Sequence, residues 1–518
     1  MKRLLSWLDA VNQIDQHNRI AAWLDRIIFV FLIVMAVSAP HSISASQAAW
    51  LIGISAWFIR CLVKPRPPFF KTPLNLAFLS FFLWSLISSV LSYAPDISLD
   101  KLRGVSLLLV FFLIVNNLRT KKAVFVLAFT LIFSCLFNVG TTLYERAVGR
   151  GVEIVEIDPK SPLILHIIDD VTDKLFIEPV HVGDTLVAIG KRKISSPEDI
   201  LSEVESKGAV KIKIYHDELY MNIDVAKVDL LSGETAAEKL GIITWKRNYN
   251  WRAQGFFGHF TTYAEALQLI SALIFGLLIA ALTTTDRRKM AVVLGIVLAA
   301  FLFALLLTAT RASQAAFVVS SLVVALIGTS RRTLLALVIV SVPVALIGLY
   351  VLQKSRNIGV YDSKDNSTTW RQTVYREGVD LATNSPRHMA VGVGMDSIKR
   401  YAKEWHLFDD GRLPMGHFHS TPLQLVVERG LPALLIWLWI LWLFGSSIWR
   451  KLRSGGILDW REKGVLLGGF GALVGFFVSG IVHYNLGDGE VAMVFYLIMG
   501  LSMVLTKDLT QIKEPSEA

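Results

Sequence analysis

The sequence contains few cysteines: only Cys61 and Cys135 occur among its 518 residues. Both lie in apolar stretches of membrane-spanning length, so the polar parts of the chain contain none. A disulfide framework and a thiolate metal site are therefore excluded. The polar segments also lack an Asp/Glu cluster with metal-ligand spacing, and we expect no metal and no other cofactor.

Charge is scarce as well. Charged residues make up 18% of the chain and hydrophobic residues 53%, whereas a soluble globular protein carries about 25% charge and no long apolar blocks. Apolar runs long enough to cross a bilayer recur from end to end. We predict an all-α polytopic membrane protein with about 12 transmembrane helices, at residues 23–38, 48–63, 74–91, 105–118, 123–143, 262–282, 290–307, 313–327, 333–352, 423–448, 465–482 and 491–505.

Lys and Arg cluster after alternate predicted spans, for example at Arg287, Arg288 and Lys289. The loops on this side and both termini contain 23 Lys/Arg and 9 Asp/Glu, a net charge of +14, whereas the whole chain carries only +10. By the positive-inside rule, both termini are expected to be cytoplasmic. Because these basic residues border the membrane, the charge does not indicate nucleic acid as a partner.

The first long polar segment, residues 144–257, separates the fifth and sixth predicted spans. Alternating apolar residues at 152–154 and 210–214 predict strands. Residues 197–206 predict a helix capped by Ser196. The segment is therefore expected to form a small α+β domain.

Within this segment, residues 151–227 resemble a bacterial PDZ domain, with 163–179 in place of the usual short Ala/Gly-rich turn. The motif residues that carry the resemblance are Gly183, Asp184, Ile189, Gly190 and Ile194. The resemblance implies an extended peptide or protein partner in the periplasm, bound by strand addition. A packing or spacer module is the alternative.

The second long polar segment, residues 353–421, precedes the tenth predicted span. Residues 370–382 have amphipathic helical spacing. Its aromatic content argues against disorder, and loops of this length are usually functional. We expect a large catalytic loop.

Two histidines, His417 and His419, stand directly before an apolar helix. Thr421, Pro422 and Gln424 fit a capping box with Thr421 as the cap. The N-terminus of a helix favours anions and disfavours imidazolium, and a neutral histidine beside an anion suits a general base. Hydrogen bonding to the loop backbone is the alternative role.

Three arginines, Arg252, Arg311 and Arg371, are predicted on the side opposite the basic loops. A guanidinium presents a planar fork of donors that fits phosphate oxygens, although a single boundary arginine could also extend to lipid headgroups. Together with the histidine pair, the three predict a diphosphate site. Supporting polar residues would be Glu265, Gln424 and Glu428, which lie in or beside predicted spans.

These motifs look like those of the O-antigen ligase and polymerase superfamily, which includes bacterial protein O-oligosaccharyltransferases. They occur in family order as Arg252–His259, Thr310–Ser313, Trp370-Arg371, Asn384–Pro386, Gly392–Gly394, His419–Gln424 and Glu428–Gly430. The resemblance implies a metal-independent, inverting glycosyltransferase of the GT-C type in the bacterial inner membrane, with its active site on the periplasmic face. The implied donor is a glycan on undecaprenyl diphosphate, and the implied acceptor of a ligase is lipid A–core.

The resemblance also implies residue roles. Arginines that match Arg252 and Arg311 hold the diphosphate, and the histidine that matches His419 activates the acceptor. The family usually has Asn after this histidine, where the chain has Ser420, so His417 is the alternative base.

The predicted parts are a membrane bundle with spans one to five (1–143), the periplasmic PDZ-like insert (144–257), spans six to nine (258–352), the periplasmic catalytic loop (353–421), and spans ten to twelve with a cytoplasmic tail (422–518). An O-antigen or exopolysaccharide polymerase and a protein O-oligosaccharyltransferase share the same motifs. From other classes, a 12-span secondary transporter would show paired halves with broken helices, and a peptide receptor would leave the arginines unexplained.

Overall fold

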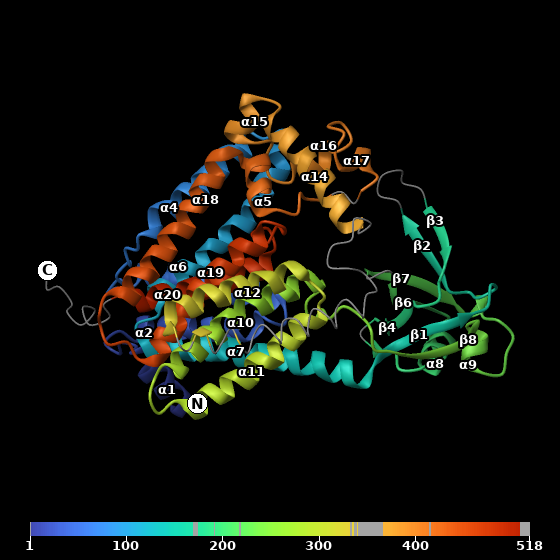
Figure 1. Ribbon diagram of the computed structural model, residues 1–518, viewed down its shortest axis with the longest axis horizontal. Helices are drawn as coiled ribbons and strands as arrows, with labels where there is room; N and C mark the ends of the chain where they lie inside the picture. Colours follow the sequence, from blue (N-terminus) through green and yellow to red (C-terminus); the bar gives the residue numbers. More distant parts are fainter. Residues whose placement is uncertain are drawn as a thin grey trace. The chain divides into compact units, whose positions relative to one another are not determined.

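The computed structural model describes residues 2–168, 175–190, 192–216, 219–331, 366–413 and 416–507, with 334, 335 and 339. By contacts the chain divides into two compact units. One comprises Met1–Val139 and Gln254–Ala518, and the other Gly140–Ala253. Figure 1 shows the first unit as a set of helices and the second as sheets with short helices.

Nine helices in the described part of the first unit are long and apolar enough to cross a membrane. They are α2 (Arg19–Ser38), α3 (Ile43–Leu62), α7 (Lys121–Val148, whose last turns belong to the second unit), α10 (Phe260–Leu282), α11 (Arg288–Leu307), α12 (Arg311–Gly328), α18 (Thr421–Arg453), α19 (Trp460–Gly480) and α20 (Gly489–Thr506). The prediction of a helical polytopic membrane protein is confirmed.

The predicted number of about 12 spans is higher than the nine among the described residues. The third span appears as α4 (Leu74–Val90), a shorter apolar helix. The fourth is α6 (Leu109–Asn117), which continues from α5 (Pro95–Val105) through a 3₁₀ turn at Ser106–Leu108. Because α5 is charged, this run does not have the composition of a span. Most of the predicted ninth span, 333–352, lies outside the described residues.

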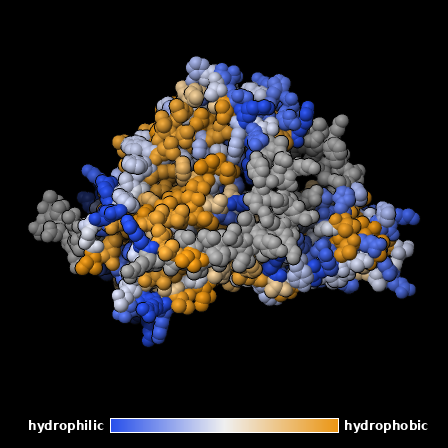
Figure 2. Space-filling model, in the orientation of Figure 1, coloured by the Kyte–Doolittle hydropathy of each residue, from blue (hydrophilic) through white to orange (hydrophobic). Residues whose placement is uncertain are grey.

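The centre of the helical unit is a close contact between α10 and α19. Glycines make this approach possible: a Cβ on Gly276 would stand 2.2 Å from the backbone nitrogen of Gly468, and small residues at such seams let membrane helices pack backbone to backbone. Most residues of α10 and α20 are buried. Exposed apolar side chains gather on α4 and α18, including Leu76, Leu79, Leu83, Leu435, Leu438 and Trp442, and Figure 2 shows a broad hydrophobic surface over this region. Such a surface suits contact with lipid chains.

Helix α18 is interrupted near its start, where Gly430 has φ 76° and ψ 171°. Pro432 follows two residues later, and its ring removes the N–H that would bond the carbonyl of Glu428. A Cβ on Gly430 would stand 2.2 Å from the carbonyl oxygen of Ala390. The break therefore requires glycine, both for its backbone conformation and for this close approach.

The carbonyl groups freed by the break bond to other segments. The N–H groups of Val393 and Gly394 donate to Val427 and Glu428, each at 2.8 Å. The indole N–H of Trp84 on α4 donates to the carbonyl of Arg429 at 2.8 Å. Since unsatisfied backbone groups are costly in lipid, these bonds fasten α4 and residues 392–394 to the interruption.

Residues 366–413 and 416–420 include a group of helices that packs against the start of α18 (Figure 1). The helices are α14 (Asn366–Thr383), α15 (Pro386–Val391), α16 (Ser397–Tyr401) and α17 (Phe408–Gly411). Their shared apolar core contains Val374, Ile398, Phe408, Phe418 and Val427. This group of helices holds the loop with the two histidines. The remaining short helix, α1 (Lys2–Asn12), precedes α2.

The second unit contains an antiparallel sheet of order β7-β6-β4-β1-β8, with β5 paired to β4. The strands are β1 (Arg150–Ile157), β4 (Thr185–Ile189), β5 (Arg192–Lys193), β6 (Ala209–His216), β7 (Leu219–Ala226) and β8 (Ile242–Asn248). A separate two-stranded sheet joins β2 (Ile164–Ile168) to β3 (Leu175–Pro179) in the stretch predicted to replace a short turn. The helices are α8 (Pro197–Lys207) and α9 (Ala236–Lys239), and a 3₁₀ turn covers Lys227–Asp229.

The core of this unit is formed by alternate residues of the strands and one face of α8, among them Val152, Ile154, Ile200, Val204, Ile212 and Ile214. Ser196 caps α8 in a capping box with Asp199, at the predicted position. The first and last strands pair Arg150 with Asn248, so the unit begins and ends at neighbouring points. The small sheet domain is thus present, and its assignment as a PDZ domain stays a prediction.

Candidate active site

Helix α18 begins one residue earlier than predicted. Ser420 is its N-cap, with a side chain that accepts from the N–H of Leu423, so Thr421 as the cap is wrong. The reason is a distant contact: the Thr421 hydroxyl lies 2.8 Å from Oδ1 of Asn485, and its N–H donates to the carbonyl of His483. The turn after α19 thereby fixes the start of α18.

The two histidines preceding this helix contact each other. Their ring centroids are 4.0 Å apart, and the backbone N–H of His419 donates to Nδ1 of His417 at 3.2 Å. His419 has a φ of 47°, in the left-handed region, so the stretch is not extended. This turn of the backbone at His419 brings the two rings together.

Helix α14 supplies the other neighbours of His419. The indole of Trp370 meets the His419 ring edge to face, with centroids 4.4 Å apart. The hydroxyl of Tyr375 donates to the His419 carbonyl at 3.0 Å. On the other side, the His417 ring lies 5.7 Å from that of Tyr484. These contacts hold both imidazoles in place, and α14 is the element that orients His419.

Burial sets the protonation of the pair. It lowers the pKa of His419 to about 2, and both the charge of Arg371 and a proton on His417, when one is present, act in the same direction. Burial lowers the pKa of His417 to about 4, assisted by Lys399. Both imidazoles are therefore neutral at neutral pH, as a base must be, and an anion beside them would raise their pKa and strengthen them as bases.

Helix α14 has two buried donors without partners among the described residues, one on Arg371 and one on Trp370, the residue that contacts His419. These donors are Nε of Arg371 and Nε1 of Trp370. Burying a polar group without a partner is costly. The two donors are thus suited to oxygen atoms of a ligand that approaches His419.

The other two predicted arginines belong to other elements of the chain. Arg311 is the first residue of α12 and is exposed; this helix packs on α10 and α19. Arg252 belongs to the unit Gly140–Ala253, where its N–H donates to the hydroxyl of Tyr215 at 3.2 Å. The charge of Arg371 acts on His419, and the roles of all three arginines stay predictions.

Gln424 and Glu428 connect the histidine loop to the break in α18. Oε1 of Gln424 accepts from the N–H of Phe418 at 2.8 Å, so this side chain does not reach back to the cap. Its Nε2 donates to Oε1 of Glu428 at 2.9 Å, and the same oxygen accepts from the N–H of Asp396. Gln424 and Glu428 therefore help to position the loop that contains the two histidines.

Glu265 is buried on α10 and pairs with another histidine. Its Oε1 lies 3.0 Å from Nδ1 of His483, the residue whose carbonyl receives the N–H of Thr421. Glu265 therefore supports the start of α18 indirectly. Sequence reasoning missed Tyr375 and Tyr484, because their proximity to the histidines depends on contacts between distant segments.

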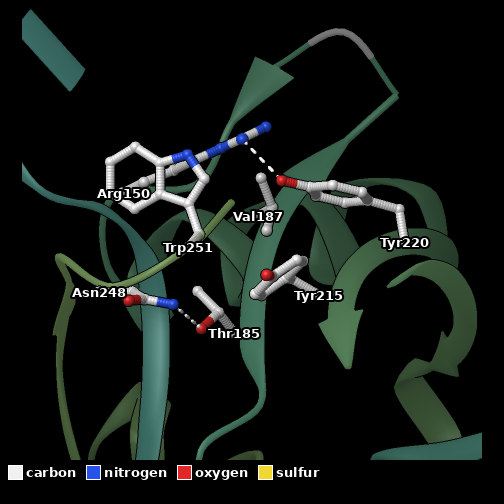
Figure 3. A pocket seen from close by; sticks show the side chains of 7 residues that line it. All are labelled: Arg150, Thr185, Val187, Tyr215, Tyr220, Asn248 and Trp251. Atoms are coloured by element: carbon white, nitrogen blue, oxygen red, sulfur yellow. Dashed lines mark hydrogen bonds between the residues drawn. The ribbon is translucent and has the colours of Figure 1, made fainter. Parts of the chain in front are cut away.

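The recess in the second unit is a separate feature, shown in Figure 3. It is lined by Arg150, Thr185, Val187, Tyr215, Tyr220, Asn248 and Trp251. Arg150 donates to the Tyr220 hydroxyl at 2.9 Å, and Asn248 donates to that of Thr185 at 2.7 Å. These two bonds join lining side chains to one another, while the buried Nε of Arg150 has no partner among the described residues. We regard the recess as a packed seam of this unit.

Residues 294–438 match the family model described as O-antigen ligase. The match confirms the resemblance to the O-antigen ligase and polymerase superfamily. It covers Arg311, Arg371, both histidines, Gln424 and Glu428, and it leaves out Arg252, Glu265 and the second unit. The curated proteins contain no match to the chain. We call residues 294–438 the O-antigen ligase segment, after the family model that they match. This segment and the apolar helices together indicate a multi-pass membrane protein that resembles glycosyltransferases.

Proposed function

We propose that this protein is an inverting, metal-independent glycosyltransferase that moves a glycan from undecaprenyl diphosphate to an acceptor hydroxyl, and that it acts as an O-antigen ligase on lipid A–core. The observation that carries the proposal is the neutral histidine pair together with the buried donors of Trp370 and Arg371, all within the O-antigen ligase segment. The basic loops support an orientation with cytoplasmic termini and a periplasmic active site in the inner membrane.

In the proposed reaction, the acceptor hydroxyl gives its proton to an imidazole while its oxygen attacks the anomeric carbon. The bond between this carbon and the diphosphate oxygen breaks with its electron pair, so the configuration inverts and undecaprenyl diphosphate leaves. Fixed guanidinium groups stabilise the charge that develops on the leaving group. The diphosphate also raises the pKa of the adjacent imidazole, which makes it a better base only when the donor is bound.

The acceptor distinguishes the proposed ligase from the other transferases of the superfamily. In a deletion strain, we expect loss of long-chain lipopolysaccharide and accumulation of lipid-linked polymer, visible on lipopolysaccharide gels and in lipid extracts. The chain should restore the ladder, and the His419→Ala variant should not. Loss of capsule or exopolysaccharide with an intact ladder would instead indicate a polymerase, and loss of glycoproteins alone a protein O-oligosaccharyltransferase.

The donor site is expected to depend on guanidinium geometry. Arg371→Lys keeps the charge but removes the fork of donors, so we expect kcat/KM to fall roughly tenfold, the cost of about one charge-assisted hydrogen bond. The assay uses purified protein with lipid-linked donor. Arg252→Lys and Arg311→Lys test the two other predicted diphosphate ligands in the same way.

Arg376→Lys is the matched control, because Arg376 is an exposed arginine on the same helix. This variant should keep its activity. Equal activity of the Arg371→Lys and Arg376→Lys proteins would remove Arg371 from the donor site.

For the second unit, we propose that an extended peptide or a protein segment binds by strand addition. Its residues lie outside the O-antigen ligase segment, so such a partner would affect recruitment or acceptor choice rather than the chemical step.

A further inference from the structure

The second unit gathers two histidines and an aspartate at one end of its sheet. His181 and Asp184 belong to the turn before β4, and His216 is the last residue of β6. These strands are neighbours, with Thr185 paired to Tyr215, so the sheet itself brings the three residues together. One ligand atom from each lies within 4.8 Å of the others.

The aspartate already organises this cluster. Its Oδ2 accepts from the N–H of His181 at 2.8 Å, and its Oδ1 lies 2.8 Å from Nδ1 of His216. This contact places an imidazole nitrogen and a carboxylate oxygen side by side, and an ion that replaces the proton they share would be held by both. The His181 ring lies near that of His216, with centroids 5.7 Å apart and planes tilted by 31°.

The paired His216 and Asp184 are more buried than a histidine–aspartate pair on the surface of the protein. The side chains of His216 and Asp184 are 11% and 6% exposed, whereas those of His406 and Asp410, also paired through Nδ1, are 81% and 60% exposed. In the described residues, the cluster of His181, Asp184 and His216 is also the one group of three or more His, Cys, Asp or Glu arranged to hold an ion. A buried, oriented imidazole with a second imidazole on an exposed turn provides a site that an ion can reach.

From this geometry we infer that the second unit binds a divalent transition-metal ion of the Zn²⁺ class through His181, His216 and Asp184. Two imidazoles and one carboxylate are a ligand set that suits Zn²⁺, with water completing the coordination. The ligands come from the turn before β4 and the end of β6, so the ion would cross-link them. The site belongs to the insert rather than to the transferase segment, and it is independent of the proposed reaction.

The test uses the full-length protein in detergent, with any histidine tag removed. The protein is equilibrated with Zn²⁺, separated from free ion by gel filtration, and its metal content is measured by mass spectrometry. The wild-type protein should retain about one Zn²⁺ per chain more than the His181→Ala/His216→Ala variant. The difference matters rather than the total, because other histidines could also retain ion.

His406→Ala is the control, since it removes a histidine–aspartate pair of the same geometry without a third ligand. It should retain as much Zn²⁺ as the wild type. His181→Ala alone changes only an exposed turn residue, so its loss of the ion cannot be attributed to misfolding when its circular dichroism matches the wild type. Equal Zn²⁺ content in the wild-type, His181→Ala and double-variant proteins would overturn the inference.

Discussion

His419→Ala is expected to lower the turnover of the transferase by about a hundredfold or more, the usual scale for the loss of a general base. The ring of His419 is neutral, held by Trp370 and Tyr375, and close to the charge of Arg371. Removing it takes away the proposed proton acceptor while leaving the buried donors of α14, Nε of Arg371 and Nε1 of Trp370, in place. Single-turnover rates should therefore fall while the affinity for the lipid-linked donor is largely kept.

His417→Ala is the comparison that assigns the base. His417 contacts His419 through its ring and accepts a hydrogen bond from the His419 backbone, so its loss should affect the position of His419 and cost less activity. An inactive His417→Ala protein beside an active His419→Ala protein would reverse the assignment. If both variants kept full activity, the histidines would serve only the structure of the loop.

Gly430→Ala should destabilise the protein by about 3 kcal/mol or more, because it adds both backbone strain and an overpacked contact. The new Cβ would stand 2.2 Å from a backbone oxygen of Ala390, and the residue would be held at a φ of 76°. The three atoms nearest this Cβ all belong to the backbone of Ala390 and Val391, so no flexible side chain could move aside to make room. We expect a lower unfolding temperature in detergent and a smaller monodisperse fraction on gel filtration.

Gly295→Ala is the control within a membrane helix. Gly295 lies in α11, and a Cβ there would meet nothing within 4 Å. Its substitution should leave the unfolding temperature unchanged or slightly higher, since alanine is the better helix former. Similar unfolding temperatures for the two variants would mean that the interruption of α18 is not a strained, closely packed feature.

Long apolar runs were predictable because their signal is local. The predicted spans 262–282 and 491–505 agree closely with α10 (Phe260–Leu282) and α20 (Gly489–Thr506), and the helix predicted at 370–382 lies within α14. The interruption of α18 was not predicted, since hydropathy continues across it. The Gly430-Leu-Pro432 sequence was the available signal.

The residues of the candidate site were proposed from the sequence and stay predictions, and their arrangement could not be predicted. The histidine pair and the three arginines stand out by type and position alone. Two contacts depend on packing between segments that are far apart in the sequence. Trp370 contacts His419, and the Thr421 hydroxyl bonds to Asn485, so that Ser420 is the cap of α18. Local patterns do not determine such contacts.

The pairing of Arg150 with Asn248 has a consequence for how this chain could arise and change. A domain whose entry and exit points are adjacent can be gained, lost or exchanged in a single genetic event, because the flanking helices need not be rethreaded through the bilayer. The helical unit and the sheet domain can therefore evolve at different rates, with the helical unit constrained by the proposed reaction and the sheet domain by whatever it binds.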